Sequence, residues 1–119
     1  MELIALLSSG KGTWTQVNGL INHGDWEKII LIGDDFSSRF EIREKKEITE
    51  FIKVDLRNRL KDLKEELLLK LKGKIHGTEV ALSIASGDGK EHMALISALL
   101  SVPAGVRFVA LTKDGIVYL

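Results

Sequence analysis

Short apolar runs alternate along the chain with segments whose apolar residues recur at helical spacing. Leu3 to Leu7 is a continuous apolar run, which is typical of a strand covered on both faces. Comparable runs predict further strands at residues 27–33, 51–54, 79–85, 106–111 and 116–119. Helical spacing predicts helices over residues 14–23 and 57–72, and from the Lys90 loop to about residue 100. Strands and helices therefore alternate, which favours an α/β fold.

Two further segments complete the predicted order. Residues 36–47 are charged with few apolar anchors, and we expect a short helix there. Asp114-Gly115 lies between two apolar runs, which predicts a C-terminal β-hairpin. The order β-α-β-α-β-α-β-α-β-β indicates a three-layer, mostly parallel sheet with helices on both faces. No repeat or linker interrupts the pattern, so we expect residues 1–119 to be a single domain with no second domain for a separate activity.

Composition narrows the classes of function. The chain has 119 residues with 17 basic and 17 acidic side chains, so bulk charge cannot bind it to duplex DNA. There is no cysteine, which excludes disulfides, thiolate catalysis and cysteine-bound zinc. No apolar run approaches the roughly 20 residues that span a bilayer, and the N-terminus lacks the basic leader of a signal peptide. We expect a cytoplasmic protein with no membrane contact.

The candidate chemistry lies after the predicted strands, where open parallel sheets bind ligands. Two loops each combine hydroxyls, two glycines and one lysine before a helix: Ser8, Ser9, Gly10, Lys11, Gly12 and Thr13, and Ser86, Gly87, Asp88, Gly89 and Lys90. Glycines let backbone N–H groups approach a phosphate, and a helix N-terminus adds partial positive charge. Short turns also contain Gly and Ser for structural reasons alone. Two such loops on one sheet edge favour phosphate or nucleotide binding.

Other candidate residues carry weaker signals. The first loop fits neither the dinucleotide fingerprint nor the Walker loop, which disfavours NAD binding and ATP hydrolysis. Gly33 and Asp34 follow the second strand, where Asp34 and Asp35 are either a carboxylate pair or a solvated turn. His92 could line the site, but the three histidines lack metal-ligand spacing. We expect neither a metal nor a resident cofactor.

The helix over residues 92–100 has almost no polar face. Its sequence includes Met93, Leu95, Ile96, Leu99 and Leu100. A helix that is apolar all round is buried all round. We expect a second subunit to cover it, with burial under residues 36–47 as the alternative.

These residues resemble the CRISPR-associated Rossmann fold (CARF) family. The likeness covers the whole order of elements and is sharpest where Ser86, Lys90 and Met93 match the family's spacing of a hydroxyl, a basic residue and a methionine. Ile84 departs from it, because the family usually has Asp or Asn there, which puts one base or ribose contact in doubt. The first loop is similar to the family's polar, glycine-containing turn. The resemblance implies a Rossmann-like fold and a two-fold homodimer that binds cyclic oligoadenylate across its interface.

From this resemblance we expect a ring nuclease that cleaves the cyclic oligoadenylate, a second messenger, without a metal ion. The ribose 2′-hydroxyl would attack the adjacent phosphorus in line, with Lys90 and Lys11 stabilising the developing charge and Ser86 or Ser9 orienting the ring. The remaining loop residues would bind the ligand: Ser8, Ser9, Gly10, Gly12, Thr13, Gly33, Asp34, Gly87, Asp88, Gly89 and His92. The alternatives are a non-catalytic sensor or sponge, and an unrelated nucleotide-binding subunit.

Overall fold

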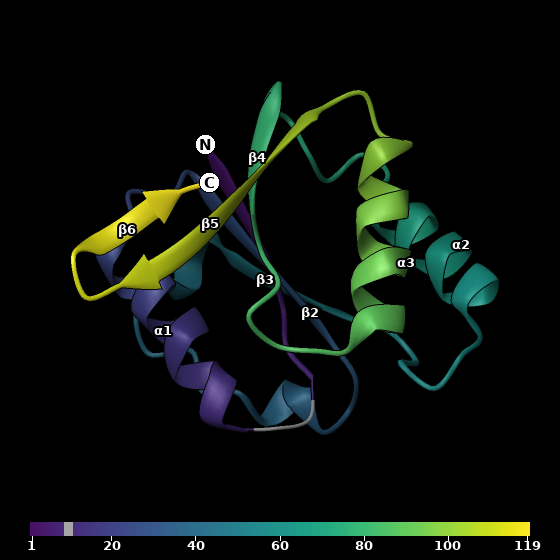
Figure 1. The fold of residues 1–119 in the computed structure, drawn as a ribbon, viewed down its shortest axis with the longest axis horizontal. Helices are drawn as coiled ribbons and strands as arrows, with labels where there is room; N and C mark the ends of the chain where they lie inside the picture. The colour runs from purple at the N-terminus through teal and green to yellow at the C-terminus, as the bar shows by residue number, and fades with distance from the viewer. Residues whose placement is uncertain (9–10) are drawn as a thin grey trace.

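The chain forms an α/β fold on a six-stranded, mostly parallel sheet (Figure 1). The computed structural model describes residues 1–8 and 11–119, and the side chain of Lys11 lies outside that description. The described strands are β1 (Glu2–Leu6), β2 (Lys28–Gly33), β3 (Thr49–Lys53), β4 (Glu79–Ser83), β5 (Gly105–Thr112) and β6 (Gly115–Tyr118). The described helices are α1 (Trp14–His23), α2 (Leu60–Leu71) and α3 (Gly89–Leu100), with 3-10 turns η1 (Lys11–Thr13), η2 (Ser37–Arg39) and η3 (Lys46–Ile48).

The strand order positions the site. The sheet runs β3-β2-β1-β4-β5-β6, with parallel pairing from β3 to β5 and antiparallel pairing between β5 and β6. From β1 the chain moves outward to β2 and β3, and then returns to place β4 on the other side of β1. The direction of winding therefore reverses between β1 and β4. In open parallel sheets a ligand crevice lies at this reversal, beside the carboxyl ends of the strands.

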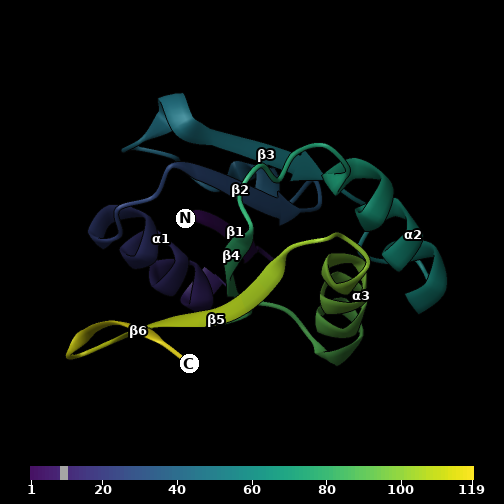
Figure 2. The same cartoon turned by 90° about the horizontal axis from the view of Figure 1, so that it is seen from above.

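The two faces of the sheet bury two separate cores. Successive residues of a strand point to opposite faces, so Leu3 and Ala5 pack with α1 while Ile4 and Leu6 pack with α2 and α3. Figure 2 shows α1 on one side of the strands and the pair α2 and α3 on the other. Burial on both faces explains why β1 reads as an unbroken apolar run. Among the described residues, no helix is long and apolar enough to cross a membrane.

Most predicted elements are confirmed, including the helix over 14–23 and the C-terminal hairpin. The helix predicted within residues 36–47 is wrong, because the described chain there forms only the short turns η2 and η3. Asp34 Oδ1 accepts the N–H of Ser37 at 2.9 Å and closes the first turn. Lys45 takes a left-handed conformation with φ 58°, which a continuing helix does not allow. Sparse apolar anchors could not overcome these local preferences.

The start of the second long helix also differs from the prediction. The spacing predicts a helix from Arg57, but α2 begins at Leu60. Asp55 Oδ1 accepts the N–H of Arg57 at 3.0 Å, and the N–H of Asn58 donates to the Asp55 carbonyl at 3.1 Å. These bonds fold residues 55–59 into a turn before the helix. The turn, called the 55–59 loop below, lies at the carboxyl edge of the sheet.

Candidate functional site

The carboxyl ends of β1 and β4 are joined by a buried hydrogen bond. The N–H of Ser8, just after β1, donates to Oγ of Ser86, just after β4, at 2.9 Å. Both serines are buried, and the indole of Trp14 donates to the Ser8 carbonyl at 2.9 Å. The two loops expected to share one sheet edge therefore meet at the reversal point. Ser86 Oγ thus accepts a hydrogen bond that holds the ends of β1 and β4 together.

The β4–α3 corner (residues 84–90) is closed by its own side chains. Asp88 Oδ1 accepts the N–H of Glu91 at 2.8 Å, and Glu91 Oε1 accepts the N–H of Asp88 at 3.0 Å. This capping box satisfies two donors and places two carboxylates at the start of α3. Gly87 has φ +103°, and a Cβ there would lie 2.5 Å from Leu6 Cδ2. A Cβ at Gly89 would meet nothing within 4 Å.

Two other predicted site residues of this corner are also engaged with backbone carbonyls. Lys90 Nζ donates to the carbonyls of Leu56 at 2.7 Å and Asn58 at 2.8 Å, both in the turn before α2. His92 Nε2 lies 2.7 Å from the carbonyl of Ser86. The structure thus brings Ser86, His92 and the corner backbone together. It ties the Lys90 ammonium to a different loop.

The β1–α1 corner (residues 7–13) is described only in part. Ser9 and Gly10 lie outside the described residues, as does the side chain of Lys11. A Cβ at Gly12 would meet nothing within 4 Å. Thr13 precedes α1 in a helical conformation, and its side chain makes no capping hydrogen bond. The first turn of α1 contains no acidic residue, so its partial positive charge meets no carboxylate from that turn.

Gly33 and Asp34 serve to hold the end of β2. A Cβ at Gly33 would lie 2.6 Å from the Leu7 carbonyl oxygen and 2.5 Å from Ser37 Cβ, so only glycine allows this close approach. Ser37 Oγ donates to the Leu7 carbonyl at 2.8 Å. Together with the bond from Asp34 to Ser37, this contact fastens the chain after β2 to the end of β1.

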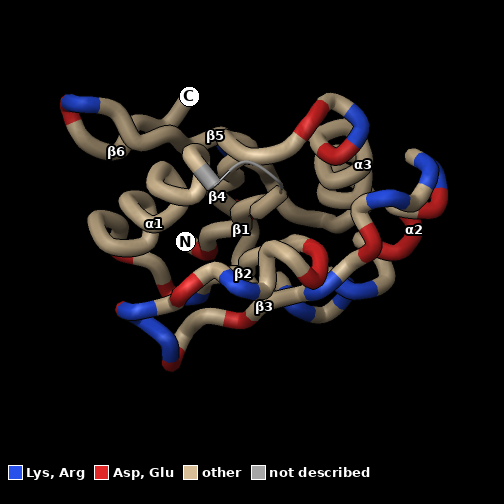
Figure 3. Tube along the Cα trace, turned by 90° about the horizontal axis from the view of Figure 1, so that it is seen from below, with Lys and Arg blue, Asp and Glu red and all other residues tan. Residues whose placement is uncertain are grey.

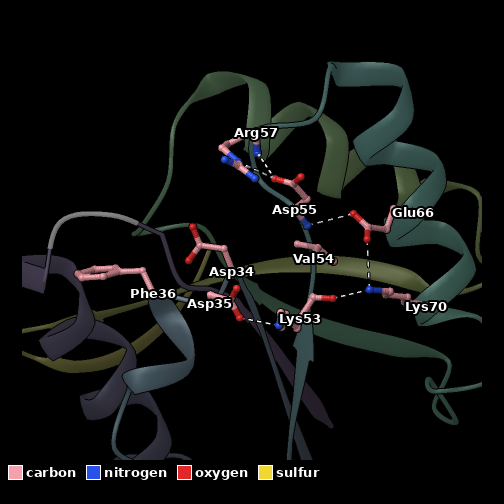
Figure 4. A pocket seen from close by; sticks show the side chains of 9 residues that line it. All are labelled: Asp34, Asp35, Phe36, Lys53, Val54, Asp55, Arg57, Glu66 and Lys70. Atoms are coloured by element: carbon pink, nitrogen blue, oxygen red, sulfur yellow. Dashed lines mark hydrogen bonds and ion pairs between the residues drawn. The ribbon is translucent and has the colours of Figure 1, made fainter.

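A cavity of about 630 Å³ lies beside this edge, between the ends of β2 and β3 and the start of α2 (Figure 4). Its lining is Asp34, Asp35, Phe36, Lys53, Val54, Asp55, Arg57, Glu66 and Lys70. Three ion pairs border it, Lys53 to Asp35 at 2.5 Å, Lys70 to Glu66 at 3.2 Å and Arg57 to Asp55 at 3.3 Å. Hydrogen bonds from the Arg57 backbone N–H and side chain lower the pKa of Asp55. The hydrogen bond and charge of Asp35 raise the pKa of Lys53.

Sequence reasoning missed the 55–59 loop as part of this edge. The leucine spacing of α2 extends back to Leu56 and so predicts a helix start at residues 55–59. The available signal was the pair Asp55 and Asn58, since both residue types favour turns and helix starts. That pair directly follows the short strand β3. A strand end followed by a turn former places a loop at the carboxyl edge.

Comparisons with known proteins add no family assignment. No protein-family model matches the chain, and no curated protein matches its sequence. Within residues 1–8 and 11–119, no three His, Asp or Glu side chains are grouped so that they could hold a metal ion.

Proposed function

We propose that this chain binds a cyclic oligoadenylate at the carboxyl edge of a Rossmann-like sheet, as its resemblance to the CARF family implies. The observation that carries the proposal is the bond between the Ser8 N–H and Ser86 Oγ, which joins the two glycine-containing corners at the reversal of strand order. A ligand bound at this edge would lie beside both corners. The first turn of α1, without an acidic residue, is the favourable place for a phosphate.

The contacts favour binding over cleavage as the primary role. Ser86 accepts the Ser8 N–H, and Lys90 Nζ donates to two carbonyls, so both residues have structural work. Metal-independent ring cleavage is the second candidate. It is favoured by the start of α1, whose partial positive charge, together with Lys11, could stabilise the negative charge that develops on the phosphate oxygens during attack by a 2′-hydroxyl. In that step the ring's own 2′-oxygen bonds to phosphorus and gives its proton to water. The P–O5′ bond breaks, the 5′-oxygen takes a proton from water, and the product ends in a 2′,3′-cyclic phosphate.

A homodimer is part of the proposal. A groove of about 420 Å³ between α2 and α3 is lined by three apolar and four polar residues, namely Leu60, Met93, Leu100, Lys61, Lys64, Ser97 and Ser101. Met93 is 57% exposed and Leu100 73% exposed. A second copy packed here would cover these two apolar side chains. Two-fold pairing also matches the symmetry of a ring with an even number of nucleotides.

Direct binding and cleavage measurements test the proposal. Isothermal titration with cyclic tetra-adenylate and cyclic hexa-adenylate should show saturable binding at one ring per two chains. Chromatography after long incubation with a chelator then separates a sponge, which returns intact rings, from a ring nuclease, which yields linear products. Lys11→Ala should weaken binding, whereas Lys113→Ala in the β5–β6 turn should not. Absence of binding to either ring would overturn the proposal.

A further inference from the structure

We infer that Lys90 is a positioning residue and that Arg57, on the loop that Lys90 holds, is the side chain that contacts the phosphodiester of the ligand. The inference rests on the proposed function and assigns a cation to it. The contacts of Lys90 lead to the 55–59 loop. They end on the two residues that flank Arg57.

Lys90 fixes the 55–59 loop from the α3 side. Its ammonium donates to the carbonyls of Leu56 at 2.7 Å and Asn58 at 2.8 Å, one on each side of Arg57. Glu66 fixes the same loop from α2, because its Oε1 accepts the N–H of Asp55 at 3.2 Å. A loop held by two helices presents its apex residue in a fixed place, which lowers the ordering cost of binding. That apex residue is Arg57.

Of the three cations that line the cavity, Arg57 can most readily turn to a ligand. Its side chain is 92% exposed, against 61% for Lys53 and 42% for Lys70, the other two cations around the cavity. Its partner is the neighbouring Asp55, with Nε 3.3 Å from Oδ1. Exposed pairs of this kind contribute little to stability, so a phosphate can replace the carboxylate at small cost. Guanidinium matches the paired oxygens of a phosphodiester.

The charges around the cavity place the phosphate on the outer side of Arg57. Asp34, Asp35, Asp55 and Glu66 line the cavity with four carboxylates against three cations, so its interior does not favour an anion. Figure 4 shows Arg57 above Asp34 and Asp35. The 55–59 loop lies against the start of α3, because Lys90 Nζ donates to the carbonyls of Leu56 and Asn58. A phosphate on this outer side would meet the guanidinium without entering the cavity.

A double-mutant cycle separates positioning from direct contact. We would measure dissociation constants for cyclic tetra-adenylate and cyclic hexa-adenylate with Arg57→Ala, Lys90→Met and the double variant, at several salt concentrations. Arg57→Ala should weaken binding about tenfold or more and reduce the salt slope by about 0.7, the share of one phosphate contact on a single strand. Lys90→Met should weaken binding less. It should add little in the Arg57→Ala background, because both changes remove the same contact.

Two controls keep the cycle specific. Arg59→Ala removes the same charge from an exposed residue of the same loop, outside the cavity lining, and should leave the salt slope unchanged. Arg57→Lys should recover part of the affinity, since it keeps the charge and loses the paired donors. Hydrogen exchange of the amides in residues 55–59 should rise in Lys90→Met and stay unchanged in Arg57→Ala.

The outcomes distinguish this inference from the proposed function. If the wild type binds a ring and Arg57→Ala binds it equally well, Arg57 is not the phosphate contact and the inference fails alone. Additive losses in the double variant would show that Lys90 contacts the ligand itself, which would also overturn it. If the wild type binds neither ring, the proposed function fails, and linear hexa-adenylate serves as the phosphodiester probe. Arg57-dependent binding of that probe would uphold the assignment, and binding indifferent to Arg57→Ala, or none, would end it.

Discussion

The β1–α1 and β4–α3 corners both combine serine, glycine and lysine, and their described residues differ in charge and packing. At the β4–α3 corner Asp88 and Glu91 close a capping box, Gly87 packs on Leu6, and Lys90 is bound to another loop. At the β1–α1 corner Gly12 has open space around it and the first turn of α1 has no acidic residue. Figure 3 shows the contrast in charge, with α1 uniformly tan and both signs side by side at the start of α3.

Loop composition therefore does not by itself identify an anion site. A phosphate at the start of α3 would meet the carboxylates of Asp88 and Glu91, which already accept backbone N–H groups. A phosphate at the start of α1 meets no acidic residue of that turn. The β4–α3 corner therefore has a structural role, because its side chains bond to the end of β1 and to the 55–59 loop. We therefore expect ligand contacts at the start of α1 and at the 55–59 loop.

The largest expected effect comes from adding a methyl group to a glycine of each corner. Gly87→Ala places a side chain at φ +103° and a Cβ 2.5 Å from Leu6 Cδ2, so we expect the free energy of unfolding to fall by about 2–4 kcal/mol. Gly12→Ala meets nothing within 4 Å and should change it by less than about 0.5 kcal/mol. Urea unfolding of both variants measures the difference. Equal losses would mean that both corners are packed alike.

The sequence predicted the parts of the fold that depend on burial and missed those that depend on local turns. The apolar run from Leu3 to Leu7 predicts a strand, and the leucine spacing of α2 predicts a helix. Both predictions are confirmed because these residues are buried in the two cores. The turns at residues 36–48 and 55–59 depend on single side chains, Asp34 and Asp55, that bond to nearby N–H groups. Such bonds compete with helix formation through small energy differences, which apolar spacing does not report.

The sequence predicted which loops lie at the candidate site, but it did not predict the contacts that their side chains make. Its loops were expected on one edge because parallel strands place their carboxyl ends together, and the bond between Ser8 and Ser86 shows them joined there. The direction of Lys90 could not be predicted, because it depends on the 55–59 loop lying within reach of α3. The place of Arg57 at this edge could not be predicted for the same reason.

A smaller loss of stability is expected when the hydrogen bond between the Ser8 N–H and Ser86 Oγ is removed. Ser86→Ala removes the acceptor of the buried Ser8 N–H, and an unsatisfied buried donor costs about 1–3 kcal/mol. Ser101→Ala, which removes an exposed hydroxyl bonded to the Ser97 carbonyl, should cost less than about 0.5 kcal/mol. Thermal unfolding compares the two variants. In Ser86→Ala, amide exchange should also increase at both corners, and an increase at only one would show that this bond does not hold them together.

The smallest effect probes the link from the β4–α3 corner to the 55–59 loop. The pKa of Asp55 is lowered first by the backbone N–H of Arg57, then by its side chain, and least by the charge of Lys90. Because the folded pKa lies below the unfolded value of about 3.9, Asp55 adds stability above that value. This contribution is lost as the pH falls through the folded pKa.

Carbon NMR of the Asp55 carboxyl should therefore show a modest rise in its pKa in Arg57→Ala, which keeps the backbone N–H, and a smaller rise in Lys90→Met. Asp55→Asn should be slightly less stable than the wild type at pH 7 and equal to it once the pH is below the folded pKa. If the pKa of Asp55 rises more in Lys90→Met than in Arg57→Ala, the 55–59 loop itself rearranges when the hydrogen bonds from Lys90 are lost. The closed corner would then control the conformation of the 55–59 loop as well as its position.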